Sequence, residues 1–251
     1  MSVILEDFTD GVCTITFNRP DKKNPMNLEL LKTLYAALGR AEEQGAEIIV
    51  IRGAGKTFSS GGDIVEFKDS DNPDIQIDLM ADYLHRSIRR IRHAKAIVIA
   101  VVEGLAVGAG MSLSLACDLT IAAKNAVMNM GYRRIGLTPD GGGSIFLSRL
   151  IGMKRFNELY LLSRNVDMEQ AKNLGLVNFV AEESELEARL QALVADLRAL
   201  PADAVGYTKE LVNQSVWSGL DLHLDKERLN VSELSKRPEF KERIQAILSK
   251  K

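Results

Sequence analysis

The stretch Ala96–Asp118, AIVIAVVEGLAVGAGMSLSLACD, decides the fold. Its first seven residues are β-branched or small and uninterrupted, which predicts a strand buried on both faces. Side chains are then absent at Gly104, Gly108 and Gly110, and an apolar run of helical character begins at Met111. A strand that passes through glycines into a helix start leaves backbone N–H groups unpaired at the positive end of the helix dipole. We therefore expect this place to hold negative charge.

Two kinds of negative group are candidates for this place. A dinucleotide site requires G-x-G-x-x-G, and the third glycine is missing after Gly108-Ala109-Gly110, so the pattern argues against it. A second glycine turn ends the apolar run 48–55, and FSSGGDIVEF follows it at 58–67. Two such turns can each supply one N–H to a single oxygen atom, which is the design of an oxyanion hole. The alternative is that these glycines serve only tight turns and close packing.

Five segments together resemble the crotonase family, also called the enoyl-CoA hydratase/isomerase superfamily. They are NRPDKKNPMN at 18–27, FSSGGDIVEF at 58–67, GLAVGAGMSLSLACDL at 104–119, RIGLTPDGGGSIFLSRLIG at 134–152 and AKNLGLVNFV at 171–180. They stand in the family's order and at its usual spacing, over nearly the whole chain. The resemblance implies an α/β crotonase fold, with a spiral of repeated ββα units over residues 1–198 and a helical trimerisation region over 199–251. The family's trimers often pair into hexamers.

The resemblance also implies where an acyl-coenzyme A would bind. The N–H groups of Gly62 and Ala109 would hold the thioester carbonyl and stabilise its enolate. The residues that follow Gly62 in FSSGGDIVEF would contact the substrate; these are Asp63, Ile64 and Val65. Lys23 would lie near the phosphates of coenzyme A, although a loop lysine is more simply a solvated one. Walls of the acyl pocket would come from Met26, the segment 67–79 and Met130.

Two positions bear on the type of reaction. In the family's hydratases, two glutamates hold and activate water, and in this sequence those positions carry Ser112 and Tyr132. Neither a serine nor a tyrosine of ordinary pKa serves easily as a general base near pH 7. We therefore expect no hydratase of the two-glutamate type. Tyr132 is expected either to offer its O–H to the substrate or to pack in the core.

Asp140, in TPDGGGS, is the acid that stays within reach of this site. One interpretation is structural, because an aspartate just before a glycine turn and an apolar run can cap a helix. The other is catalytic: a partly desolvated carboxylate takes a proton from one carbon and returns it to another. One carboxylate suits isomerisation, whereas two suit water addition. The pattern resembles the single-aspartate enoyl-CoA isomerases of the superfamily, including those of phenylacetate catabolism that act on a ring-epoxide acyl-CoA.

Other activities stay open beside the isomerase. The same aspartate position matches the 4-chlorobenzoyl-CoA dehalogenases, in which an aspartate attacks an aromatic ring. Those enzymes also use a histidine and an aromatic-lined pocket, and this chain has 6% aromatic residues and no histidine near a glycine turn, which ranks dehalogenation low. Ring-cleaving hydrolases, naphthoate synthases, a hydratase or hydrolase using Asp140 with water, and a non-catalytic acyl-CoA-binding protein are further alternatives. His85 and His93, on an expected helix over 75–94 rich in arginine, are expected to pack or to face solvent.

Composition narrows the class of protein. The 251 residues are 46% hydrophobic with a formal net charge of −2, which predicts a soluble protein with a sizeable core and argues against nucleic acid as the main partner. We expect no membrane span and no secretion signal, and hence a cytoplasmic location. Cys13 and Cys117 lie in apolar segments and are expected to be reduced core thiols. No metal or redox cofactor is implied, since coenzyme A would arrive as part of the substrate.

Overall fold

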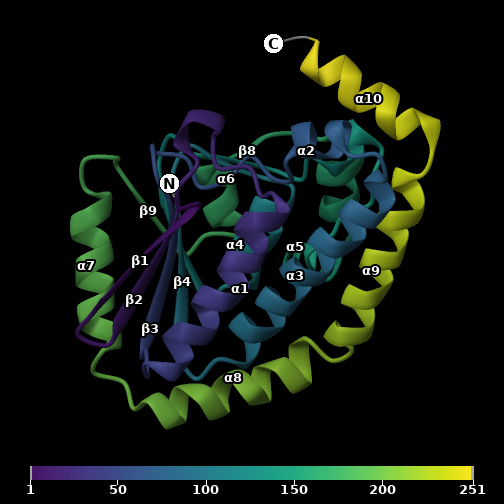
Figure 1. Cartoon of the computed structure of the whole chain (residues 1–251). Helices are drawn as coiled ribbons and strands as arrows, with labels where there is room; N and C mark the ends of the chain where they lie inside the picture. Colours follow the sequence, from purple (N-terminus) through teal and green to yellow (C-terminus); the bar gives the residue numbers. More distant parts are fainter. Residues whose placement is uncertain (1, 250–251) are drawn as a thin grey trace.

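The computed structural model describes residues 2–249, and they form an α/β structure around a six-stranded sheet (Figure 1). The order across this sheet is β1-β2-β3-β4-β6-β9, and β1 pairs antiparallel with β2 while the other pairs are parallel. The strands are β1 (Ile4–Thr9), β2 (Val12–Phe17), β3 (Ile48–Gly53), β4 (Ile97–Val102), β6 (Leu119–Ala123) and β9 (Phe179–Ala181). A second sheet has the order β5-β7-β8 and contains β5 (Leu105–Val107), β7 (Val127–Asn129) and β8 (Val166–Asp167).

The central strand is β4, and all six of its residues are buried, as the sequence predicted. Parallel strands covered on both faces read as unbroken apolar runs, because both sets of alternating side chains meet a hydrophobic layer. On one face, alternate residues of β3 and β4 pack against α1 (Leu28–Glu43) and α3 (Pro73–His93). On the other face the intervening residues pack against α7 (Leu186–Leu197), which Figure 1 shows on the far side of the sheet from α1 and α3.

Local signals in the sequence fix several element boundaries. Asn27 caps α1 by accepting a hydrogen bond from the N–H of Leu30 at 3.0 Å, and Asp167 caps α6 (Met168–Asn173) in the same way. The sequence Thr9-Asp10-Gly11 predicts a hairpin, and Asp10 and Gly11 both have positive φ in the turn between β1 and β2. The side-chain types at Asn27 and Asp167 likewise predict the two caps, and the structure confirms all three features. The helix expected from Met111 starts two residues earlier, at Ala109.

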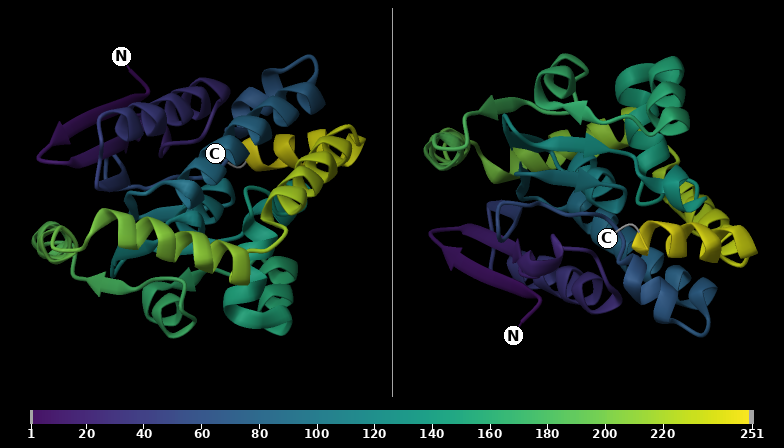
Figure 2. Two further views of the ribbon diagram at one scale, coloured as in Figure 1. Left: turned by 90° about the horizontal axis from the view of Figure 1, so that it is seen from below. Right: turned by 90° about the horizontal axis from the view of Figure 1, so that it is seen from above.

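The remaining helices include three in the C-terminal region, where the sequence predicted helical structure. They are α2 (Ile64–Asp69), α4 (Ala109–Ala116), α5 (Gly143–Leu162, kinked at Gly152), α8 (Ala202–Val216), α9 (Leu220–Ser235) and α10 (Pro238–Leu248), with the 3-10 turns η1 (Pro20–Lys22) and η2 (Tyr132–Ile135). Figures 1 and 2 show α8, α9 and α10 following one another around the outside of the α3 layer. The division at residue 198 between a core and a trimerisation region stays a prediction.

The cluster of arginines on α3 predicts a solvated face, and Arg92 departs from that prediction. Arg92 is buried and donates to the carboxylate of Asp118 at 3.0 Å and to the carbonyl of Ala116 at 3.1 Å. His85 is also buried, whereas His93 is exposed.

Both cysteines are buried and free, as expected, and burial raises the pKa of Cys13 to about 11. In the described part of the chain, every helix is too short or too polar to traverse a lipid bilayer.

Candidate active site

The two glycine turns of the sequence lie side by side in the structure. Residues 58–61, which follow β3, run parallel to β5: the N–H of Ser59 donates to Leu105 at 2.8 Å, and the N–H of Val107 donates back to Ser59 at 3.0 Å. A Cβ atom on Gly110 would stand 2.9 Å from the Cβ of Ser59, and one on Gly61 would stand 2.7 Å from the carbonyl of Val107. The glycines therefore allow a contact that side chains would prevent.

This contact brings two uncommitted amides to the same place. Ala109 is the first residue of α4, where N–H groups lack an intrahelical acceptor, and its cap residue Gly108 offers no side chain. On the other turn, the neighbours of Gly62 are engaged, since Gly61 donates to Ser59 Oγ and Asp63 donates to the carbonyl of Met26. Within residues 2–249, neither the N–H of Gly62 nor that of Ala109 donates to a protein acceptor. Both are partly exposed.

Both turns open into one apolar cavity of about 210 Å³. Five of the residues predicted to be catalytic or to contact the substrate line it, and these are Gly62, Ile64, Ala109, Tyr132 and Asp140. The apolar walls include Met26 and, from the segment 67–79, Phe67 and Ile77 as expected, together with Leu84 of α3. Asp140 is the single carboxylate among the described residues that line this cavity. The structure therefore places Gly62, Ala109 and Asp140 around one largely apolar cavity.

Other predicted contact residues do not line the cavity. Asp63 caps α2 and forms an ion pair with Arg19 at 2.8 Å, Val65 is half exposed, and Met130 is buried outside the cavity wall. Lys23 is exposed at the end of η1. Binding of substrate by Asp63, Val65 and Lys23 stays a prediction.

Asp140 is paired with a histidine that the sequence analysis set aside. His85 of α3 is 1% exposed, and its Nε2 lies 2.6 Å from Oδ1 of Asp140. The N–H of Gly141 also points at Nε2, at 3.3 Å. His85 is buried, in line with the expectation that it packs, and it also bonds to Asp140 because the fold brings α3 to the glycine turn. The expectation that no histidine lies near a glycine turn, which ranked dehalogenation low, is wrong.

The helix-cap interpretation of Asp140 is wrong as well. The cap residue of α5 is Gly142, and the side chain of Asp140 makes no capping hydrogen bond. The N–H groups at the start of α5 that have no acceptor within the helix are bound instead by Glu227 of α9. Glu227 accepts from Gly142 at 2.6 Å and from Ser144 at 2.9 Å. The carboxylate of Asp140 is thus left to face His85 and the cavity.

Ser112 and Tyr132, which stand where the family's hydratases carry glutamates, are hydrogen-bonded to each other. Ser112 Oγ and Tyr132 Oη lie 3.0 Å apart, and Tyr132 donates to the carbonyl of Asp140 at 2.8 Å. Burial raises the pKa of Tyr132 well above its ordinary value, and the nearby charge of Asp140 adds to the shift. The hydroxyl therefore stays protonated, so Tyr132 acts as a donor and not as a base.

His85, Asp140 and Glu227 also form the one group, within the described residues, whose spacing suits a metal ion: their ligand atoms lie within 4.8 Å of each other. The group escaped the sequence analysis because its members lie far apart in the chain. Its atoms are already used by hydrogen bonds: the Glu227 oxygens bind backbone amides, and Asp140 binds His85. Nδ1 of His85 is the ring nitrogen of this group that has no described partner.

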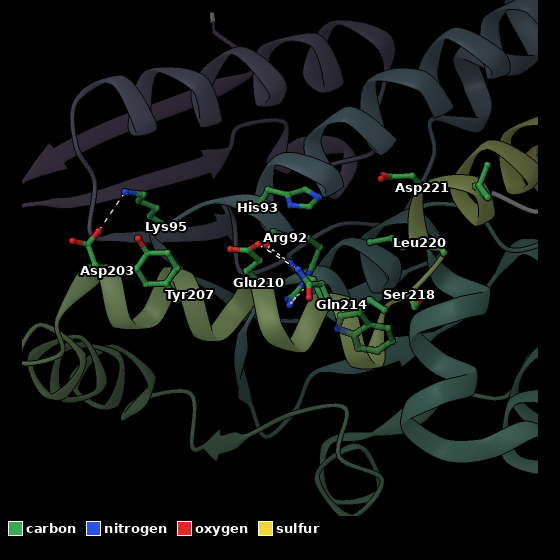
Figure 3. Close-up of a pocket in the computed structure, with 15 residues that line it drawn as sticks. Arg92, His93, Lys95, Asp203, Tyr207, Glu210, Gln214, Ser218, Leu220 and Asp221 are labelled. Carbon is green, nitrogen blue, oxygen red and sulfur yellow. Dashed lines mark hydrogen bonds and ion pairs between the residues drawn. The ribbon is translucent and has the colours of Figure 1, made fainter.

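A larger groove, about 690 Å³, lies between the end of α3 and α8, away from the glycine turns (Figure 3). Several of its polar side chains are hydrogen-bonded to one another. Lys95 faces Asp203 at 3.3 Å, and Arg92 donates to Asn213 at 3.1 Å. The smaller cavity is the candidate active site because the uncommitted amides and the buried acid meet there.

Comparison with known proteins shows the family of the chain. A model of the enoyl-CoA hydratase/isomerase family matches residues 7–251. The chain is 32% identical to 4-chlorobenzoyl coenzyme A dehalogenase-2 of Arthrobacter sp., over 97% of this chain and 90% of the relative. It is 31% identical to 1,2-epoxyphenylacetyl-CoA isomerase of Escherichia coli K12, over 100% and 97%. The crystal structure of an enoyl-CoA hydratase from Mycobacterium avium subsp. paratuberculosis superposes with a TM-score of 0.90 at 32% identity, over 98% of both chains.

The protein therefore belongs to the enoyl-CoA hydratase/isomerase family and is an acyl-CoA enzyme of the crotonase superfamily. The crotonase fold expected from the sequence is confirmed. Relatives of similar identity are named isomerase, hydratase and dehalogenase, so the reaction has to be argued from the site itself.

Proposed function

We propose that this protein is an enoyl-CoA isomerase, which shifts a double bond of an acyl-CoA with one aspartate as the proton carrier. The observation that carries the proposal is the position of Asp140: it is the single carboxylate among the described residues lining the cavity onto which Gly62 and Ala109 open. The similarity to 1,2-epoxyphenylacetyl-CoA isomerase supports the same class of reaction.

The two amides begin the reaction. The N–H groups of Gly62 and Ala109 bind the thioester oxygen, which becomes negative as a proton leaves the carbon chain. Neither amide has to break a bond within the protein first, since neither donates to a described acceptor. Preorganised donors of this kind in an apolar site contribute about 3 kcal/mol each to the transition state. The cavity walls exclude water and strengthen that interaction.

Asp140 then moves the proton. Its carboxylate removes a proton from the carbon on one side of the double bond, and the electrons spread through the dienolate onto the thioester oxygen. The same proton returns to the carbon at the far end, so the substrate neither gains nor loses atoms. No metal or redox group takes part in this mechanism, and coenzyme A is part of the substrate. His85 holds the Asp140 carboxylate through the 2.6 Å contact between Nε2 and Oδ1.

The occupants of the two glutamate positions favour isomerisation over water addition. Water addition in the two-glutamate manner needs a second carboxylate to position and activate the nucleophile. Here Ser112 and Tyr132 bind each other at 3.0 Å, and Tyr132 also binds the Asp140 carbonyl. Neither supplies a base.

The test is a panel of 3-enoyl-, 2-enoyl- and ring-epoxide-CoA thioesters, followed by ultraviolet absorbance and by mass in deuterated and in oxygen-18 water. An isomerase gives a product of unchanged composition, with no oxygen-18 and with less than one full deuterium incorporated per turnover. Incorporation of oxygen-18 into a hydroxyacyl-CoA would contradict the proposal and identify a hydratase. Absence of any reaction across the panel, with thioester binding retained, would identify a non-catalytic acyl-CoA-binding protein.

A second candidate is favoured by the pairing of Asp140 with His85, and by similarity to 4-chlorobenzoyl coenzyme A dehalogenase-2. In this reaction Asp140 attacks the ring carbon that bears a halide, the halide leaves with its electron pair, and an aryl ester forms. Water, deprotonated by His85, then hydrolyses the ester to a phenol and restores Asp140. Release of chloride from 4-chlorobenzoyl-CoA, with oxygen-18 first entering Asp140 in a single turnover, would establish it.

We also propose that the protein assembles into trimers or hexamers in the cytoplasm. The outer faces of the C-terminal helices support assembly, because large apolar side chains there are exposed; examples are Tyr207, Leu211, Leu222 and Leu229. Light scattering on the purified protein measures the assembly directly. A monomer at micromolar concentration would contradict it.

A further inference from the structure

Glu227 of α9 is a carboxylate in an otherwise apolar helix face. It is 4% exposed and lies in register with the buried residues Leu220, Leu224 and Val231. Burying a carboxylate costs free energy unless charges or hydrogen bonds compensate it. Among the described residues its only ion-pair partner is His223, with Nε2 3.6 Å away on a side chain that is 42% exposed. A cation does not explain why this acid is buried.

The compensation comes from the backbone at the start of α5. One carboxylate oxygen of Glu227 accepts the N–H of Gly142 at 2.6 Å, and the other accepts the N–H of Ser144 at 2.9 Å. The hydroxyl of Ser144 donates to the same oxygen as its amide. A carboxylate that accepts several backbone N–H groups at a helix start is stabilised by those bonds and by the helix dipole. Glu227 thus clamps the segment that directly follows Asp140.

Within this segment the turn is closed by one backbone hydrogen bond, from the N–H of Gly143 to the carbonyl of Asp140 at 3.1 Å, so contacts from outside add to its rigidity. Gly141 and Gly142 have φ of +65° and +74°, so a tight left-handed turn carries the chain from Asp140 into α5. Consecutive glycines have the greatest backbone freedom of any residues, and nothing in their own side chains holds the turn. The carbonyl of Asp140 is fixed from the other side by the Tyr132 hydroxyl at 2.8 Å.

We propose that Glu227 is a positioning residue for the reaction at Asp140: by binding Gly142 and Ser144 it holds the glycine turn so that the Asp140 carboxylate faces the cavity. The inference rests on the proposed function only in taking Asp140 as the reacting acid, and it holds equally for proton transfer and for nucleophilic attack. On this proposal a residue of α9, a helix that contains neither glycine turn, orients the carboxylate of Asp140.

The central variant is Glu227→Gln, which keeps the volume but replaces one acceptor oxygen with an NH₂ group that faces an N–H. We expect kcat to fall 10- to 100-fold while KM for the thioester changes less than threefold, because the cavity and the two amides are untouched. Glu227→Asp keeps the charge but retracts it by one methylene, and we expect an intermediate kcat. Asp225→Asn, on the exposed side of α9, is the matched control and should retain wild-type kinetics.

A second measurement keeps the inference testable if Glu227→Gln does not fold. In the wild-type protein the amides of Gly142 and Ser144 should exchange with deuterium at least 100-fold more slowly than unprotected amides. Exchange at the unprotected rate would overturn the inference. So would a folded Glu227→Gln variant with wild-type kcat, or one in which KM rises and kcat is unchanged. A wild-type protein without activity on any thioester would instead count against the proposed function, and the exchange rates would still test the clamp.

Discussion

Nε2 of His85 lies 2.6 Å from Oδ1 of Asp140, inside the protein and at the edge of the apolar cavity. Nε2 has two hydrogen-bond partners, the carboxylate of Asp140 and the N–H of Gly141. If Nε2 carries a proton it donates to Asp140, whereas it has to be bare to accept from the N–H of Gly141 at 3.3 Å. A proton can therefore reside on either member of the pair while a hydrogen bond is kept. The other ring nitrogen, Nδ1, is buried without a described partner.

His85→Ala is expected to lower kcat 10- to 100-fold, because Asp140 then loses the group that orients its carboxylate. The matched control is His93→Ala, on the exposed end of the same helix, and it should keep the wild-type rate. Steady-state kinetics with the best thioester of the panel measures both. Equal rates for the two variants would show that His85 has no part in the reaction.

Gly62→Pro removes one of the two uncommitted amides. We expect a loss of about 3 kcal/mol of transition-state stabilisation, or roughly 100-fold in kcat, well beyond any loss of substrate binding. Gly62→Ala is the control, since it keeps the N–H and its Cβ meets only the far end of the Phe67 ring, at 2.9 Å. Circular dichroism of both variants checks the fold. If Gly62→Pro folds and matches Gly62→Ala in kcat, the carbonyl is not bound there.

Tyr132→Phe removes a buried hydroxyl that binds both Ser112 and the Asp140 carbonyl. We expect the free energy of unfolding to fall by about 1–2 kcal/mol, because buried acceptors lose a partner. The loss of kcat should be smaller than that of the Asp140→Asn variant, since the raised pKa of Tyr132 keeps it protonated and excludes it as the base. Urea unfolding and kinetics test the two statements separately. A Tyr132→Phe variant as inactive as Asp140→Asn would assign the tyrosine a direct role.

The ion pair between Asp78 and Arg228 predicts a pH dependence of stability. Arg228 lies 2.6 Å from Asp78 and lowers the pKa of that carboxyl below its ordinary 3.8. A depressed pKa means that the stabilisation is present above about pH 3.8 and is lost as the pH falls through the folded-state value. Because both groups are about a third exposed, the contribution is below about 1 kcal/mol.

The test compares Asp78→Asn with wild type by urea unfolding from pH 7 down to pH 3. The variant should be slightly less stable at pH 7, and the difference should stay constant to about pH 4 and shrink only below it. A difference that already disappears between pH 7 and pH 5 would contradict this assignment.

Periodicity and caps predicted the framework of the fold. The buried strand β4 and the caps at Asn27 and Asp167 rest on interactions between residues close in sequence, or on the alternation of apolar side chains. The same holds for the approach of the two glycine turns, because parallel strands end at one edge of a sheet. The family resemblance added the roles of Gly62 and Ala109, which stay predictions; both residues line the same cavity.

The partners of Asp140 were not predicted, because they come from helices far away in the chain. A signal was nevertheless present. His85 falls between Ala81 and Ile88 on the apolar face of α3, and Glu227 interrupts an apolar face of α9. A titratable residue within a buried stripe has to find a hydrogen-bond partner. The pattern alone gives no identity for that partner, which is why Asp140 was also interpreted as a helix cap.

The most direct test of the central claim is the rate of double-bond migration in the Asp140→Asn variant. Asparagine keeps the size of the side chain but cannot accept and return a proton. With a 3-enoyl-CoA substrate, the account predicts that kcat falls by at least 100-fold while the thioester still binds, since the amides of Gly62 and Ala109 are unchanged. A variant that isomerises the substrate at the wild-type rate would contradict the account.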